Sequence, residues 1–179
     1  MVGPAQPALP VGSPAAAVIH ALVDRGESVA TVESLTGGLL AATLVEIAGA
    51  SRVFRGGLVV YATDLKASLA DVPADLLAER GPVDPDVAVA LAEGGRKRCA
   101  ADWCLATTGV AGPKGQGGQP VGLVFIAVAG PDRTWVRRLD LNGNRAAIRT
   151  ETVVAALRLL ADQLQQSRPP GREPRTSVA

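Results

Sequence analysis

A short turn joins an apolar strand pattern, Ser28–Val32, to an amphipathic helical pattern, Leu39–Ile47. The turn carries two hydroxyl side chains, Ser34 and Thr36, and the glycine pair Gly37-Gly38. Such a turn sets hydroxyls at the carboxyl end of a strand, beside the exposed N–H groups of a helix start. That position favours negative charge, including the oxyanion that develops in an acyl transfer. The junction therefore predicts a hydrolase, or at least an anion-binding site.

Strand and helix patterns alternate along the rest of the chain. Further strands are expected at Val53–Ala62, Trp103–Thr107, Val121–Ala129 and Thr134–Leu141. Helices are expected at Pro14–Asp24, Thr36–Ala48, Asp64–Leu69, Ala74–Glu79, Pro85–Ala100 and Arg145–Gln165. The last two strands form a hairpin pattern, so the order predicts an α/β fold, a three-layer α/β/α sandwich around a mixed β-sheet. Inside the second strand, the pair Gly56-Gly57 predicts a bulge or a close approach by another backbone.

The length of 179 residues suits one domain with a single sizeable core. Proline, glycine and other small or polar residues dominate both ends of the sequence, which is typical of chain that cannot bury a core. We therefore predict a flexible N-terminal arm at residues 1–12, one domain at residues 13–166 and a disordered tail at residues 167–179.

Composition argues against several classes of protein. The formal net charge is +1 and aromatic residues make up 3% of the chain, so nothing favours nucleic-acid binding. No apolar run approaches the roughly 20 residues of a membrane span, and the N-terminus lacks a signal-peptide pattern, so we expect a cytoplasmic protein without a membrane partner. His20 is the only histidine, and Cys99 and Cys104 are not spaced as a zinc or redox pair. We therefore expect no metal, no cofactor and no Ser-His-Asp triad.

Sites in open α/β sheets lie outside the carboxyl ends of the strands. Three candidate segments follow expected strands and are therefore predicted to lie together: Ser34–Gly38, Tyr61–Lys66 and Thr108–Gly118.

Ser34 is the first candidate nucleophile at that edge. Because no usable histidine exists, its base would be a lysine whose charge is discouraged by burial, and Lys66 fits that role. Tyr61 lies five residues before this lysine and is expected to share its hydrogen-bond network. The structural alternative is that Ser34 and Thr36 only cap a helix while Lys66 is solvated.

Other residues near the same strand ends have both a chemical and a structural interpretation. Ser51 is a second candidate nucleophile or a substrate ligand, or it simply begins the next strand. Glu33 is an acid or base, although we favour a role in fixing the turn by accepting backbone N–H bonds. The loop Thr108–Gly118 suits a phosphate or carboxylate, or it is only a connection. Arg145 or Arg149 could fork onto a phosphate, or both are surface arginines.

Taken together, these motifs resemble the C-terminal domain family of competence/damage-inducible protein A, whose enzymatic members are nicotinamide-nucleotide amidases. The resemblance covers about Ala15 to Leu164 and rests on four pieces in order: Glu33-Ser34-Leu35-Thr36-Gly37-Gly38, Gly56–Tyr61 with Lys66, Thr108–Pro113, and Gly143-Asn144-Arg145 with Arg149. The family often has cysteine where this chain has Leu35, so no mechanism here can need a thiol at that position.

The resemblance implies hydrolysis of the carboxamide of nicotinamide mononucleotide to nicotinic acid mononucleotide and ammonia. The expected route is metal-free, with Ser34 as nucleophile, Lys66 as base and the backbone N–H groups near Thr36–Gly38 as oxyanion donors. The site residues so assigned are Ser34, Lys66, Tyr61 and Ser51 for catalysis and Thr36, Gly37, Gly38, Thr108, Gly109, Gly112, Arg145 and Arg149 for substrate binding.

The expected partners are a small pyridine nucleotide and a second copy of the chain, since a homodimer is the common state of soluble enzymes. Two other functions remain open from the sequence. The domain could be a non-catalytic nucleotide-binding or regulatory module of the same fold, and an association with competence raises nucleic-acid binding, against which the balanced charge argues.

Overall fold

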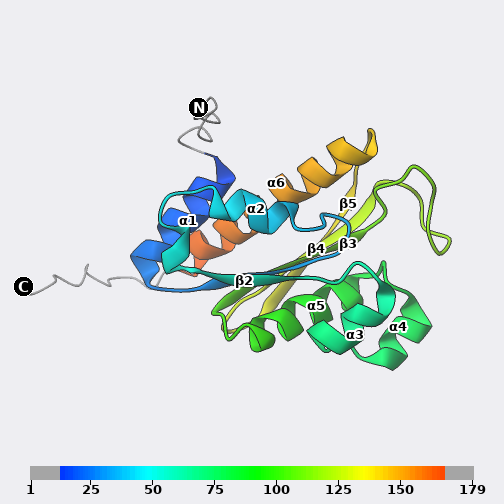
Figure 1. The fold of residues 1–179 in the computed structure, drawn as a ribbon, viewed down its shortest axis with the longest axis horizontal. Helices are drawn as coiled ribbons and strands as arrows, with labels where there is room; N and C mark the ends of the chain where they lie inside the picture. The colour runs from blue at the N-terminus through cyan, green and yellow to red at the C-terminus, as the bar shows by residue number, and fades with distance from the viewer. Residues whose placement is uncertain (1–12, 168–179) are drawn as a thin grey trace, which may run out of the picture.

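A five-stranded sheet with the order β2-β1-β3-β4-β5 forms the middle of the computed structural model, which describes residues 13–167 (Figure 1). The strands are β1 (Val29–Glu33), β2 (Phe54–Val59), β3 (Trp103–Gly109), β4 (Leu123–Ala129) and β5 (Thr134–Asp140). Strand β1 pairs in parallel with β2 and β3, whereas the β3–β4 and β4–β5 pairs are antiparallel. The sheet is therefore mixed, as predicted, and β4 and β5 form the expected hairpin.

Helices cover both faces of this sheet. One face packs against α1 (Pro14–Arg25), α2 (Leu39–Val45) and α6 (Arg145–Gln166), and the other against α3 (Thr63–Ala70), α4 (Ala74–Arg80) and α5 (Pro85–Arg98). A 3₁₀ turn, η1 (Ala50–Arg52), precedes β2. This arrangement confirms the predicted three-layer α/β/α sandwich. The predicted arm at residues 1–12, and all of the predicted tail beyond Ser167, lie outside the described residues.

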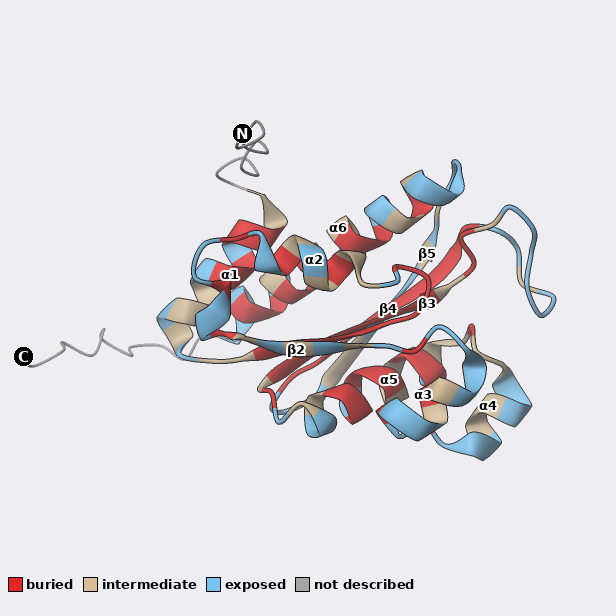
Figure 2. Cartoon of the chain, viewed as in Figure 1, coloured by how far each residue is buried: buried red, intermediate tan, exposed pale blue. Residues whose placement is uncertain are grey.

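Two separate apolar clusters fill the spaces between the layers. Strand β4 contributes Val124, Ile126 and Val128 to one cluster and Leu123 and Phe125 to the other, because successive side chains of a strand point to opposite faces. Figure 2 shows the central strands and the inner faces of α5 and α6 as buried. The long apolar run of β4 therefore has the two-sided burial that its sequence pattern predicted.

Local signals set the element ends, and several ends differ from the prediction by two or three residues. The Ser13 hydroxyl accepts from the Ala16 N–H and caps α1, as a Ser-Pro start predicts. Helix α2 begins at Leu39 rather than Thr36, because Gly37 and Gly38 adopt positive φ angles of 59° and 94° that no helix continues. Strand β2 ends at Val59 rather than Ala62, so the residues up to Ala62 form a connection to α3.

The glycine pair in β2 also has the role its sequence predicted. The β1–β2 register is irregular between Val29 and Ala30, whose partners are Phe54 and Gly56. A Cβ on Gly57 would overlap the Thr31 hydroxyl, so only glycine allows this close approach.

Helix α5 contacts α3 closely through Gly94. A Cβ at this position would overlap the carbonyl oxygen of Ala70, and backbone cannot give way as a flexible side chain does. We expect Gly94→Ala to lower the free energy of unfolding by about 2 kcal/mol, the overpacking cost exceeding the helix-propensity gain of alanine. Urea unfolding measures the loss, with Lys97→Ala on the exposed face of α5 as a control expected within about 0.5 kcal/mol of wild type. Equal stability of the Gly94 variant would contradict the close approach.

Among residues 13–167, no helix combines the length and apolar character needed to cross a membrane.

Candidate active site

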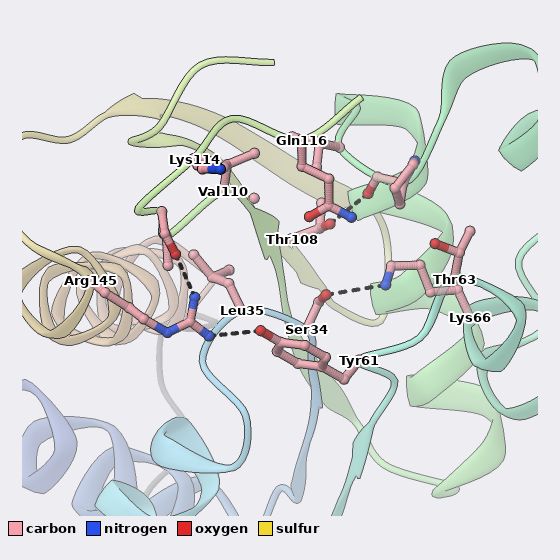
Figure 3. Close-up of a pocket in the computed structure, with 15 residues that line it drawn as sticks. Ser34, Leu35, Tyr61, Thr63, Lys66, Thr108, Val110, Lys114, Gln116 and Arg145 are labelled. Carbon is pink, nitrogen blue, oxygen red and sulfur yellow. Dashed lines mark hydrogen bonds between the residues drawn. The ribbon is translucent and has the colours of Figure 1, made fainter. Parts of the chain in front are cut away.

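The carboxyl ends of β1, β2 and β3 meet at one edge of the sheet and surround a pocket (Figure 3). Four segments line it: the turn after β1, the β2–α3 connection with the first turn of α3, the α4–α5 connection and the loop after β3. Arg145, the first residue of α6, also lines the pocket. The topology therefore brings together the three segments that the sequence predicted to converge.

Ser34 and Lys66 form the buried centre of this pocket. Ser34 directly follows β1 and Lys66 lies in α3, and their side chains point toward each other in Figure 3. The Lys66 Nζ atom lies 3.1 Å from the Ser34 Oγ atom and 2.8 Å from the carbonyl oxygen of Val60. Lys66 is only 1% exposed, and Ser34 is 8% exposed. The alternative of a solvated lysine is therefore wrong.

Burial changes the proton affinity of this lysine. Loss of solvation lowers the pKa of Lys66 from 10.5 to about 8, and the nearby negative charge of Asp64 opposes that change. A lysine with such a pKa is partly uncharged near neutral pH. As an ammonium it donates to both Ser34 and Val60, whereas as an amine it keeps a donor for Val60 and has a lone pair that can accept the Ser34 proton. The pair can therefore activate a hydroxyl.

Glu33 fixes the turn that carries Ser34. Its buried carboxylate accepts from the backbone N–H groups of Gly38, Leu40 and Ala41, at 3.0, 3.0 and 2.8 Å. The favoured structural role of Glu33 is confirmed. The backbone N–H groups at the start of helix α2 therefore donate to a side chain of the same chain and are not free to bind a ligand.

Three residues of this turn, assigned to substrate binding from the sequence, are engaged elsewhere. The Gly38 N–H bonds to Glu33, and the Gly37 N–H donates to the Ser34 carbonyl oxygen at 3.1 Å, so neither is the oxyanion donor that the sequence predicted. The Thr36 side chain is fully buried, with its hydroxyl oxygen 2.8 Å from that of Thr107. None of the three lines the pocket. The expectation failed because the turn directs these groups inward, toward the chain itself.

The two candidate arginines lie one turn apart on α6 and have different partners. Arg145 donates to the Gly112 carbonyl at 2.8 Å and to the Tyr61 hydroxyl at 2.7 Å, at the pocket mouth. Arg149 instead donates to the carbonyl oxygens of Leu35 and Thr36, at 3.0 and 2.6 Å, and does not line the pocket. Arg145 is thus placed for a ligand, and the substrate-binding assignment of Arg149 is corrected to a contact with the turn.

Tyr61 and Ser51 also differ from expectation. Tyr61 lines the pocket, but its hydroxyl bonds to Arg145 and not to the Ser34–Lys66 pair. Ser51 is exposed and lies in η1, before β2, whereas the pocket lies beyond the opposite end of that strand. The expectation that Ser51 reaches the same strand ends is therefore wrong.

The loop after β3 forms a large part of the pocket wall. Thr108, Gly109 and Gly112 line it as expected, and the Thr108 hydroxyl donates to the carbonyl of Pro82 at 2.6 Å. Sequence reasoning singled out none of five further lining residues. Thr63, Lys114 and Gln116 lie within the predicted segments but carry no motif of their own, and Pro82 and Val83 lie outside those segments.

The pocket is cationic although the chain as a whole is nearly neutral. Lys66, Lys114 and Arg145 line it, and among the described lining residues none is acidic. A pocket with this charge favours an anionic ligand. His20 and the two cysteines lie elsewhere, and within residues 13–167 no three His, Cys, Asp or Glu side chains gather as a metal site.

The fold and site define a class of protein, an α/β sandwich domain with a buried serine–lysine pair in a cationic pocket. The chain belongs to the CinA C-terminal domain family, whose model matches residues 12–164. The resemblance found in the sequence motifs is thereby confirmed.

Individual relatives agree with this membership. The chain is 50% identical over 147 residues to a CinA-like protein of Frankia casuarinae, covering 82% of this chain and 34% of that protein. It is 46% identical over 144 residues to a putative competence-damage inducible protein of Desulforamulus reducens, covering 80% and 35%. The chain thus spans about a third of the length of these curated relatives.

Solved structures show the same fold over nearly their whole length. The competence/damage inducible protein CihA from Agrobacterium tumefaciens superposes with a TM-score of 0.81 at 36% identity, covering 86% of this chain and 94% of that one. A CinA superfamily protein from Klebsiella pneumoniae superposes with a TM-score of 0.83 at 29% identity, covering 86% and 96%.

Proposed function

We propose that this domain is a nicotinamide-nucleotide amidase that converts nicotinamide mononucleotide and water to nicotinic acid mononucleotide and ammonia. The observation that carries the proposal is the buried contact of 3.1 Å between Lys66 Nζ and Ser34 Oγ. An amine with a pKa of about 8 is matched to proton transfer near neutral pH. The motif resemblance supplies the substrate, and the cationic pocket suits its phosphate.

In the proposed reaction, Ser34 Oγ attacks the carboxamide carbon while the neutral amine of Lys66 takes the hydroxyl proton. The C–N bond of the tetrahedral intermediate then breaks, and Lys66 returns its proton to the departing nitrogen, which leaves as ammonia. A water molecule attacks the resulting ester with Lys66 again as base, and the acid is released from Ser34. Each group of the pair is thereby restored.

Other groups of the pocket would hold the substrate. Arg145 and Lys114 supply positive charge at the mouth for a phosphate, and Tyr61 and Thr108 present hydroxyl oxygens to the ribose or ring. No step of this proposal uses a metal or a cofactor.

The direct test is to incubate the purified protein with nicotinamide mononucleotide and measure both ammonia and nicotinic acid mononucleotide. Nicotinamide riboside, which lacks the phosphate, serves as the comparison substrate and is expected to react with a higher KM. Absence of ammonia, together with a nucleotide-dependent rise in melting temperature, would instead support a non-catalytic binding module.

The rate is expected to rise with pH because Lys66 must lose its proton to act as base. With a pKa of about 8 in the free protein, kcat/KM should rise roughly tenfold per pH unit below pH 7 and level off above pH 9. Initial rates between pH 5.5 and 9.5, as assay conditions, measure this profile. A profile that is flat from pH 6 to 9, or that falls, would contradict Lys66 as the base.

A further inference from the structure

Three successive carbonyl groups of the turn after β1 are each fixed by a hydrogen bond. The Ser34 carbonyl accepts from the Gly37 N–H, and Arg149 donates to the next two, those of Leu35 and Thr36. The Leu35 carbonyl has no other partner in the described part of the chain. The Thr36 carbonyl also accepts from the Leu39 N–H at 3.2 Å, so the peptide plane that Arg149 holds by itself is the one between Leu35 and Thr36.

Two amides of the turn, those of Leu35 and Thr36, have no acceptor in the described part of the chain, and of these two residues only Leu35 lines the pocket. Within residues 13–167, the Leu35 N–H finds no acceptor, although Leu35 is only 3% exposed and lines the pocket beside Ser34. The Ser34 carbonyl and the Leu35 N–H belong to one planar trans peptide and point in opposite directions. Because that carbonyl is turned inward to Gly37, the Leu35 N–H is turned away from the inside of the turn. A buried amide without an acceptor calls for a ligand.

We propose that Arg149 is a positioning residue that holds the Leu35 N–H as the oxyanion donor next to Ser34. The inference rests on the proposed amide hydrolysis. The fork of Arg149 binds the carbonyls of Leu35 and Thr36, so it fixes the peptide plane that directly follows the one carrying the Leu35 N–H. The donor's own plane is held through the Ser34 carbonyl by the Gly37 N–H. On the opposite side of the turn, Glu33 holds the amides from Gly38 onward. Two buried or half-buried charges of opposite sign thus leave the donor little freedom, as oxyanion stabilisation requires.

The kinetic test compares Arg149→Met with Arg158→Met, since Arg158 is an exposed arginine on the same helix. We expect kcat of Arg149→Met to fall about 100-fold, with KM for nicotinamide mononucleotide within about twofold of wild type. The Arg158 variant should keep both constants. A raised KM with unchanged kcat would show that Arg149 binds substrate and would overturn the inference, while leaving the amidase proposal intact.

A second variant tests the same role if Arg149→Met does not fold. Should Arg149→Met melt below the assay temperature, Arg149→Gln keeps one amide donor and is expected to lose about tenfold in kcat. Wild-type kcat in a folded Arg149→Gln variant would contradict the positioning role in that case.

A fluorophosphonate probe makes the test independent of the natural substrate, because its phosphoryl oxygen occupies the oxyanion position when serine attacks. We expect Ser34 of the wild-type protein to be labelled, and the labelling rate of Arg149→Met to be at least tenfold lower. Slower labelling of Arg149→Met than of wild type, without ammonia release from the mononucleotide, would refute the proposed substrate and uphold the role of Arg149. Equal labelling rates of the two proteins, or no labelling of either, would overturn that role.

Discussion

Replacement of Lys66 by methionine is expected to lower kcat/KM about 10³-fold or more at pH 8. Methionine fills a similar volume but has no lone pair of sufficient basicity, so the Ser34 hydroxyl loses the one side-chain partner it has within residues 13–167. The measurement is ammonia release, with Lys97→Met as the matched control, since Lys97 is exposed on α5. A Lys66→Met variant with more than about a tenth of wild-type activity would remove this lysine from the mechanism.

Unfolding measurements on the same variant show whether a loss of activity reflects a loss of folding, and they also test the pKa of Lys66. Because folding lowers the pKa of Lys66 to about 8, the folded protein binds fewer protons than the unfolded chain between pH 8 and 10.5. The free-energy penalty for burying this side chain in wild type therefore has its full size below pH 8, and it disappears as the pH rises through 10.5.

At pH 7, the free energy of unfolding of Lys66→Met should exceed that of wild type by about 1 kcal/mol. Removal of the buried amine raises it by about 3 kcal/mol, and part of this gain is offset because the Val60 carbonyl loses its donor. Urea unfolding of both proteins at several pH values should show this advantage shrinking by about 3 kcal/mol up to pH 10.5. A pH-independent difference would mean that Lys66 has an ordinary pKa when folded.

Replacement of Ser34 by alanine is expected to have the largest effect of all, a loss of about 10⁴-fold or more in kcat. The variant has no nucleophile, although the pocket and the turn amides remain. We expect nicotinic acid mononucleotide to raise the melting temperatures of Ser34→Ala and of wild type by similar amounts, because the expected substrate contacts lie elsewhere in the pocket.

Ser51→Ala is the matched control for this experiment. Ser51 is exposed at the other edge of the sheet, so its variant should keep wild-type kcat and KM. Mass spectrometry of acid-quenched reactions should find the acyl group on the peptide that contains Ser34. Substantial activity of Ser34→Ala, or an adduct at another residue, would place the nucleophile elsewhere.

Topology explains why the central pair could be predicted from the sequence. Ser34 and Lys66 both follow strands that are parallel neighbours, and the carboxyl ends of parallel neighbours share one edge of the sheet. The same rule explains the error at Ser51, which precedes its strand and therefore lies at the opposite edge. A hydroxyl or amine side chain near an apolar strand therefore indicates a residue of this site only when it follows the strand along the chain, and not when it precedes it.

The orientation of the turn and of the arginines could not be predicted in the same way. Arg145 and Arg149 are four residues apart on α6 and share one helix face, yet the first contacts Gly112 and the second contacts Leu35. Which loop each arginine meets depends on how the helix is set over the sheet edge, and no local pattern encodes that. The cytoplasmic location and the homodimer expected from the sequence stay predictions.

An isotope-edited NMR titration of the lysine side chains tests the central claim most directly. The chain has three lysines, Lys66, Lys97 and Lys114, so the Lys66→Met variant assigns the signal of interest by its absence. The account predicts that the Lys66 ε-methylene signal titrates with a midpoint near pH 8. A midpoint above pH 10, the ordinary value for a solvated lysine, would contradict a neutral amine acting on Ser34.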